Sequence, residues 1–205
     1  MAAKTIVIDG VGGQGVRVIG NTMASLLAVM DYEVTLLFDY DSSVRGGMSE
    51  AFLAYDREPV SNFVIERADV VLRLADRGPN HLTADYVIAD CDLMKPGEKG
   101  EEIPFMQLGV EKFGRDLFGN MIALGRLLCI CDVDFTDEHL REALPKKYID
   151  ENIAAIKYGY GLDRDSIREI VAEQAASTFA ARYAEKVLAG TPPAEAVELA
   201  AARNR

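Results

Sequence analysis

The residues best suited to chemistry lie near the start of the chain, in the stretch KTIVIDGVGGQGVRVIG at positions 4–20. Gly10, Gly12 and Gly15 match the pattern G-x-G-x-x-G. They lie between a predicted strand and a predicted helix, the context that this pattern requires. Glycines let a turn take unusual dihedral angles and let a phosphate approach main-chain N–H groups at a helix start. Such a turn binds a phosphate or only packs the helix onto a sheet. The ligand-contacting candidates here are Gly12, Gly13, Gln14 and Gly15.

A second cluster, DSSVRGG at positions 41–47, follows the next apolar run. Ligands of open parallel sheets collect outside the carboxyl ends of the strands, so this loop and the glycine turn are predicted to line one crevice. Arg45 offers a planar fork of donors to a phosphate or carboxylate, with Arg17 in support, unless Arg45 pairs with a surface acid. The candidates from this loop are Ser43, Arg45 and Gly46.

Asn120 is a further candidate, because this polar residue lies inside the apolar stretch LFGNMIALGRLLCI at 117–130. A buried amide without partners costs about 1–3 kcal/mol, so Asn120 is expected to have them. The partner is either a loop carbonyl or a ligand, and Asn120 therefore joins the cofactor-binding candidates.

The elements that must position these residues alternate along the first half of the chain. Strands are predicted at 4–9, 33–39, 51–55, 69–74 and 85–90, and an apolar stripe from 16 to 30 predicts a helix between the first two. That βαβ unit predicts a right-handed crossover and two parallel, neighbouring strands. The polar stretch 95–102 is expected to be a solvated loop. From about 110 onward the pattern is helical, and it ends in one long amphipathic helix at 164–189.

Composition narrows the function classes. The net charge of −11 disfavours nucleic acid and anionic membranes as partners. Three cysteines and two distant histidines give no spacing for an iron–sulfur cluster, a structural zinc or a histidine-based triad, so no metal ligand and no catalytic residue is assigned. Neither a membrane span nor an export signal is recognised, and a cytoplasmic location is expected.

Several segments together resemble one family. GVGGQGV at 10–16, SVRGG at 43–47, GNMIALG at 119–125, LPKK at 144–147 and NIAAIKYGY at 152–160 are similar to the gamma subunit, or gamma domain, of the 2-oxoacid:ferredoxin oxidoreductases. The resemblance implies an α/β fold with a doubly wound, mostly parallel Rossmann-like sheet over residues 1–162. Residues 163–205 would be a helical C-terminal extension, in the same domain or as an interface arm.

The resemblance also implies a function. The chain would be one subunit of an enzyme that oxidatively decarboxylates a 2-oxoacid to an acyl-CoA and reduces ferredoxin. It would help to bind coenzyme A and assemble with alpha and beta subunits, with or without a ferredoxin-like delta subunit. Thiamine diphosphate, magnesium and [4Fe-4S] clusters would lie in those partners. The stretch DYDSSVRGG lacks the Gly-Pro-Glu turn that family members often carry before the arginine.

Two other readings stay open. Asp39, at the end of the second predicted strand, stands where an NAD-binding protein places its ribose carboxylate, which would suit a free-standing dehydrogenase. The chain could instead be a purely structural subunit whose glycine turn packs against a partner chain and touches no ligand. The sequence does not select the 2-oxoacid or the subunit stoichiometry.

Overall fold

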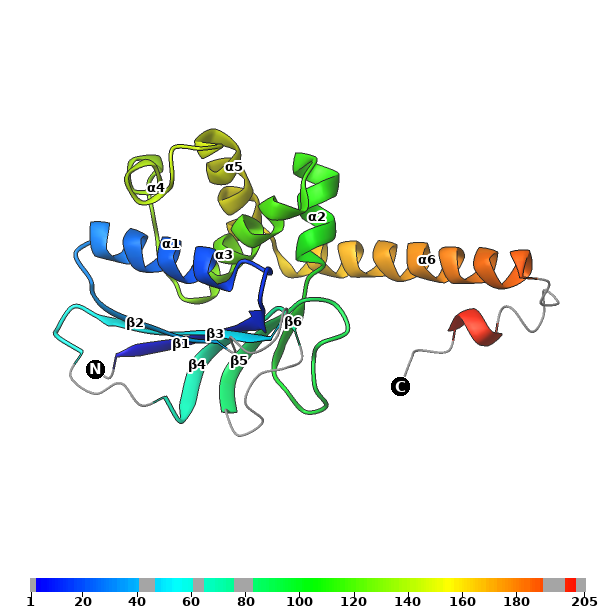
Figure 1. The fold of residues 1–205 in the computed structure, drawn as a ribbon, viewed down its shortest axis with the longest axis horizontal. Coiled ribbons are helices and arrows are strands. Elements are labelled where there is room, and N and C mark those ends of the chain that lie inside the picture. The colour runs from blue at the N-terminus through cyan, green and yellow to red at the C-terminus, as the bar shows by residue number, and fades with distance from the viewer. Residues whose placement is uncertain (1–2, 41–46, 61–64, 76–82, 190–197, 202–205) are drawn as a thin grey trace. The chain divides into compact units, whose positions relative to one another are not determined.

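A computed structural model describes residues 3–40, 47–60, 65–75, 83–189 and 198–201 (Figure 1). The chain divides into two compact units, residues 1–162 and residues 163–205. The strands are β1 (Lys4–Val11), β2 (Glu33–Tyr40), β3 (Met48–Asp56), β4 (Arg67–Arg73), β5 (Thr83–Ala89) and β6 (Gly100–Glu102). The helices are α1 (Val16–Val29), α2 (Phe105–Phe113), the 3-10 turn η1 (Asp116–Phe118), α3 (Gly119–Ile130), α4 (Asp137–Ala143), α5 (Ile149–Tyr160) and α6 (Arg164–Leu188).

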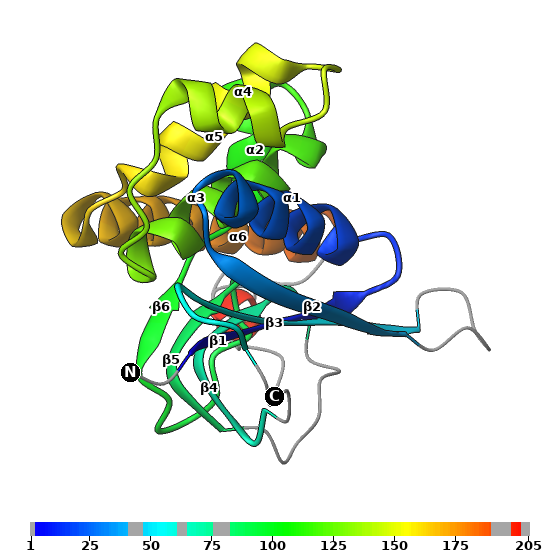
Figure 2. The same cartoon turned by 90° about the vertical axis from the view of Figure 1, so that its left-hand side faces the viewer.

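The described strands form one sheet in the order β2-β3-β1-β4-β5-β6. β1, β4, β5 and β6 are mutually parallel, whereas β3 runs antiparallel to both of its neighbours, β1 and β2. The prediction of a mostly parallel α/β sheet with a helical C-terminal region is confirmed. The prediction that the first two strands are neighbours is wrong, because β3 folds back from β2 and inserts between them (Figure 2).

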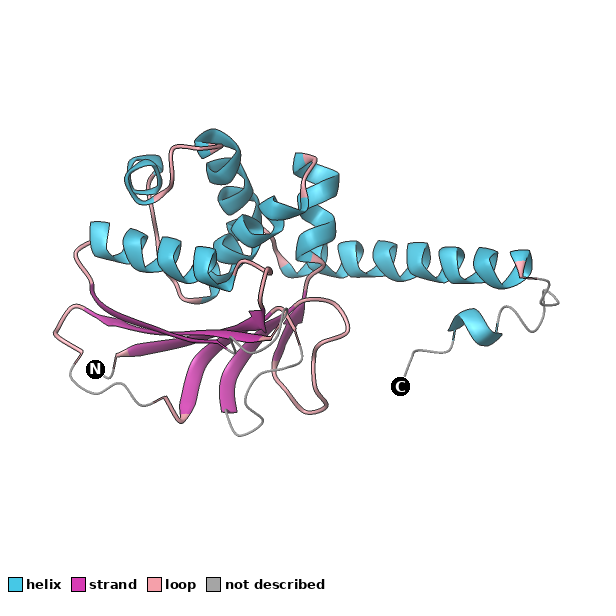
Figure 3. Ribbon diagram, in the orientation of Figure 1, coloured by secondary structure: helices cyan, strands magenta, loops and turns pink. Residues whose placement is uncertain are grey.

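Helix α1 packs on the strands that surround its own crossover. Its buried stripe includes Ile19, Met23 and Leu26, and it contacts β1, β2 and β3. α3 contacts β4, and α2 and α5 pack against α3 (Figure 3). At the α3–α5 contact the backbones are close, since a Cβ on Gly125 would lie 1.9 Å from the Ile156 carbonyl oxygen. α3 is buried over most of its length, as its apolar sequence predicts.

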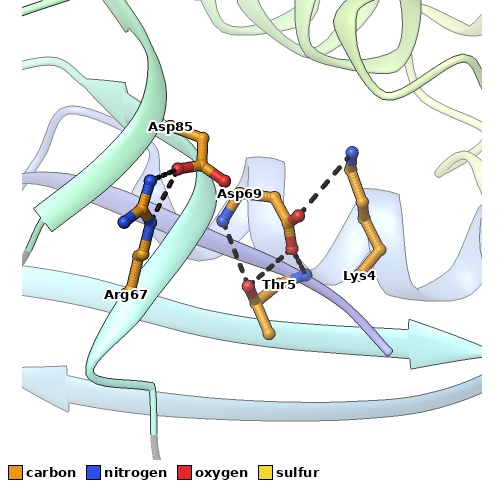
Figure 4. Close-up of polar contacts among 5 residues, drawn as sticks. All are labelled: Lys4, Thr5, Arg67, Asp69 and Asp85. Carbon is orange, nitrogen blue, oxygen red and sulfur yellow. Dashed lines mark hydrogen bonds and ion pairs between the residues drawn. The ribbon is translucent and has the colours of Figure 1, made fainter. Parts of the chain in front are cut away.

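Polar contacts hold β1, β4 and β5 together at the end of the sheet where these strands begin (Figure 4). The main-chain N–H and the hydroxyl of Thr5 donate to Asp69 Oδ2 at 2.7 and 2.8 Å, and the Asp69 N–H donates back to the Thr5 hydroxyl. Arg67 pairs with Asp85 on the next strand. These contacts fix the register of β1, β4 and β5, and therefore fix where the opposite ends of these strands lie.

Two elements have no counterpart among the sequence predictions. Gly100–Glu102 forms the strand β6 inside the stretch expected to be a loop, and α2 begins at Phe105. In the C-terminal unit, α6 confirms the long helix predicted at 164–189. Within the described residues, no helix combines the length and the apolar character needed to cross a membrane.

Candidate functional site

The glycine turn joins the end of β1 to the start of α1. Gly13 and Gly15 have φ values of 101° and 79°, a region that residues with a Cβ rarely adopt, so the glycines at these two positions follow from the backbone path. The Gln14 N–H donates to the Val11 carbonyl at 3.1 Å and closes the turn. The sequence prediction of a tight glycine turn between a strand and a helix is confirmed at this level of backbone geometry.

The Gln14 side chain is bound to the main chain on both sides. Its Oε1 accepts from the Val11 N–H at 2.8 Å, and its Nε2 donates to the Leu74 carbonyl at 2.8 Å. Leu74 directly follows β4, so Gln14 ties the end of β1 to the end of the neighbouring strand. The principal role of the Gln14 amide in this structure is therefore to hold the turn in shape.

Some main-chain donors in the turn are used, and others are open. The Gly12 N–H donates to the Gly47 carbonyl at 2.9 Å. Within the described residues, the N–H groups of Gly13, Gly15 and Val16 have no hydrogen-bond acceptor. α1 has no acidic residue in its first turn, so nothing there opposes an anion at the positive end of its dipole. The turn has the donors and the field that a phosphate needs.

Asn120 approaches this turn from a distant part of the sequence. A Cβ built on Gly15 would lie 2.1 Å from Asn120 Nδ2, so the amide lies directly against Gly15. Asn120 Oδ1 is buried and has no hydrogen-bond partner among the described residues. The structure thus brings Asn120 together with the glycine turn and leaves its buried Oδ1 without a hydrogen-bond partner in the described part of the chain.

The loop candidates Ser43, Arg45 and Gly46 lie outside the described residues. The described residue that follows them, Gly47, is hydrogen-bonded to Gly12 as stated above. Arg17 is described: it is exposed, and its guanidinium carbon lies 5.3 Å from the centre of the Phe38 ring.

Asp39 does not occupy the position expected of an NAD-binding carboxylate. β3 separates β2 from β1, and neighbouring strands are about 4.8 Å apart, so Asp39 is displaced by one strand from the glycine turn. Its cross-strand neighbour is Glu50 of β3, and Glu50 in turn lies opposite Asp9 of β1. Sequence reasoning missed Asp9 and Glu50, because only the strand register aligns them with Asp39.

The cysteines offer no second site. Cys91, Cys129 and Cys131 form no disulfide bond, and burial raises the pKa of Cys131 to about 12. Within the described ranges there is no group of three or more histidine, cysteine, aspartate or glutamate side chains arranged to hold a metal ion. Among the described residues, the glycine turn therefore remains the candidate site for an anion.

These features define an α/β protein with a glycine turn between its first strand and its first helix. Residues 5–162 match the family model described as pyruvate ferredoxin/flavodoxin oxidoreductase. The chain belongs to this family, and the resemblance noted in the sequence is confirmed. It is a gamma subunit of a 2-oxoacid:ferredoxin oxidoreductase, part of an oxidoreductase complex with other subunits as partners. The alternative of a free-standing NAD dehydrogenase is not favoured.

Individual relatives agree with this assignment. The 2-oxoglutarate synthase subunit KorC of Archaeoglobus fulgidus is 29% identical over 164 residues, which cover 77% of this chain and 86% of that protein. The keto/oxoacid ferredoxin oxidoreductase gamma subunit of Geobacter sulfurreducens has a similar fold, with a TM-score of 0.62 and 22% identity, over 78% of this chain and 95% of that one. The pyruvate oxidoreductase subunit PORC of Thermotoga maritima gives a TM-score of 0.61 at 18% identity, over 78% and 96% of the two chains.

A third solved structure is a longer chain. The 2-oxoglutarate:ferredoxin oxidoreductase of Magnetococcus marinus, solved with 2-oxoglutarate, coenzyme A and succinyl-CoA bound, gives a TM-score of 0.64 at 19% identity. The match covers 78% of this chain but only 31% of the Magnetococcus chain. The shared fold thus makes up nearly all of two of these solved chains and about a third of the other.

Proposed function

We propose that this chain helps to seat coenzyme A in its complex, with the glycine turn as the phosphate-binding element. The observation that carries the proposal is the set of open N–H groups at Gly13, Gly15 and Val16, at the positive end of α1. A similar fold belongs to an enzyme solved with coenzyme A bound, which supports the choice of ligand.

Each residue has a stated part in this proposal. Gly12, Gly13 and Gly15 bring the main chain close to a phosphate, and Gln14 holds the turn through its bonds to Val11 and Leu74. The amide of Asn120 offers its Oδ1 to a donor on the ligand, such as a hydroxyl or an amide N–H. The remaining contacts are assigned to the loop residues Ser43, Arg45 and Gly46, with Arg45 as the cationic group.

The rest of the reaction is assigned to partner subunits. We infer that alpha and beta chains, with or without a ferredoxin-like delta chain, hold thiamine diphosphate, magnesium and the [4Fe-4S] clusters, and that ferredoxin accepts the electrons in the cytoplasm. Coenzyme A supplies the thiol that accepts the acyl group. This chain contributes fixed donors that orient the coenzyme, and on its own it is expected to decarboxylate no 2-oxoacid.

The test uses the assembled complex and three arginine and asparagine variants. Arg45→Ala and Asn120→Ala should each raise the KM for coenzyme A, because each removes a ligand contact, while the KM for the 2-oxoacid stays the same. Arg67→Ala is the matched control, since Arg67 is an exposed arginine at the start of β4 (Figure 4), whereas the glycine turn follows the end of the parallel strand β1.

A purely structural turn is the competing function, and one observation favours it. The Gly12 N–H and both polar groups of Gln14 are already bonded within the chain, so the turn holds its shape without a ligand. If Arg45→Ala and Asn120→Ala leave the KM for coenzyme A at the control value, the structural role is the correct one.

A further inference from the structure

The strand register aligns four charged residues across the sheet. Asp39 of β2 lies opposite Glu50 of β3, Glu50 lies opposite Asp9 of β1, and Asp9 lies opposite Arg73 of β4. Directly opposite residues point to the same face, with Cβ atoms about 4.5–5.5 Å apart. Three carboxyl side chains, the acid row Asp39–Glu50–Asp9, therefore stand side by side, and the arginine comes only after the last of them.

Glu50, at the centre of the acid row, is poorly placed to carry a negative charge. Its residue surface is only 2% exposed, that of Asp9 is 5% exposed, and Glu50 Oε1 is buried without a hydrogen-bond partner in the described part of the chain. The Arg73 guanidinium donates two hydrogen bonds of 2.7 Å to Glu98, so much of its charge is already compensated by that acid. Burial, and then the charges of Asp9 and Asp39, raise the pKa of Glu50 to about 7.

The acid row lies close to the glycine turn. Gly12 follows Asp9 by three residues, and Gly47 precedes Glu50 by three, and these two glycines are hydrogen-bonded to each other. At about 3.3 Å per residue along a strand, the row is about 10 Å from the turn. That is comparable to the screening length at physiological salt, so a change of charge in the row reaches an anion bound at the turn.

We propose that Glu50, buried at the centre of the acid row without a partner for its Oε1 among the described residues, is a proton-binding group whose ionisation weakens anion binding at the glycine turn. The second half of the proposal rests on the anion-binding role proposed above. Ionisation of Glu50 adds one negative charge to the acid row, and the added charge weakens the affinity for the ligand by about threefold per ligand charge at about 10 Å.

The proton on Glu50 is tested on the full chain, without any ligand. The pKa of a glutamate is about 4.3 in the unfolded chain, and that of Glu50 in the folded chain is about 7. As pH rises between these two values, the unfolded chain releases the Glu50 proton first, so the folded state loses stability. Over this pH interval, the ionisation of Glu50 should raise the equilibrium constant for unfolding by about two orders of magnitude. The Glu50→Gln variant should lack this increase. Glu33→Gln is the control, since Glu33 is exposed at the other end of β2. An unchanged pH dependence in Glu50→Gln would overturn the proposal.

The effect on the ligand is tested in the assembled complex. The KM for coenzyme A should rise between pH 6 and pH 8 by a larger factor in the natural chain than in Glu50→Gln, by about threefold for one ligand charge. The phosphates of coenzyme A titrate equally in both, so the ratio between the two proteins isolates Glu50. Equal factors in the two proteins would refute the coupling, while the effect of Asn120→Ala on the same KM decides separately whether the turn binds the coenzyme.

Discussion

Replacing Gly15 with alanine tests the contact between the glycine turn and Asn120. Gly15 has a φ of 79°, where an L side chain costs about 1–2 kcal/mol. Its new Cβ would also lie 2.1 Å from Asn120 Nδ2, which is far inside contact distance, so the amide or the start of α3 must move. Gly13 is a matched control, because it has a φ of 101° but no atom within 4 Å of the corresponding Cβ.

The magnitude follows from separating these two costs. Gly13→Ala should lower the free energy of unfolding by the backbone strain alone, about 1–2 kcal/mol. Gly15→Ala adds the cost of forcing a side chain into occupied space, about 1–3 kcal/mol more. Asn120→Ala empties that space and removes an acceptor that has no partner among the described residues. The double variant should therefore be more stable than the sum of the single changes predicts, by about 1–3 kcal/mol.

The measurement is urea unfolding of the full chain for the natural protein, the three single variants and the double variant, with the slope m compared throughout. If Gly15→Ala costs no more than Gly13→Ala, Asn120 does not lie against the turn. Additive effects of Gly15→Ala and Asn120→Ala would lead to the same conclusion, since residues that do not touch show no coupling.

Two further variants probe the framework around the site. Arg126→Ala should lower the free energy of unfolding by about 3–5 kcal/mol, because it leaves Glu101 buried without its cation and removes a donor 2.6 Å from the Leu162 carbonyl. Arg141→Ala, which breaks an exposed ion pair with Asp150, should lower the free energy of unfolding by under about 1 kcal/mol. If Arg126→Ala and Arg141→Ala lose equal free energy of unfolding in chemical denaturation, the Arg126–Glu101 pair contributes no more than an exposed pair. Gln14→Ala should cost about 1–3 kcal/mol, since it removes two hydrogen bonds and leaves the Val11 N–H and Leu74 carbonyl without their partner. Gln107→Ala, at an exposed position, should change thermal or urea stability by less than about 0.5 kcal/mol, and a similar value for Gln14→Ala would show that its amide does not bridge the strands.

Local patterns were sufficient to predict the elements of the site but not their neighbours. The glycine turn, the buried stripe of α1 and the apolar helix α3 each follow from a few adjacent residues, and their positions agree with the structure. The insertion of β3 between β1 and β2 could not be predicted in this way. The short apolar run AFLAY indicates a strand, but strand pairing depends on contacts between distant residues.

β6 was missed for a related reason. The letters GEE have weak strand propensity, and the strand exists because it pairs with β5. Gly100 permits this pairing, since a Cβ there would lie 1.9 Å from the Val87 carbonyl oxygen. The acid row was hidden in the same manner: Asp9, Asp39 and Glu50 are far apart in sequence and become neighbours only through the register of three strands.

The division of polar groups within the glycine turn explains why sequence reasoning identified the right place but gave Gln14 a different role there. A side-chain amide beside a phosphate motif looks available for a ligand, yet both groups of Gln14 are bonded to the main chain. Those internal bonds fix the directions of the N–H groups that remain open, and a donor held in place before binding loses less entropy when the ligand arrives. The residues that build the turn and those that contact a ligand are therefore different, so Gln14 variants should change stability and coenzyme affinity together, whereas Arg45 variants should change affinity alone.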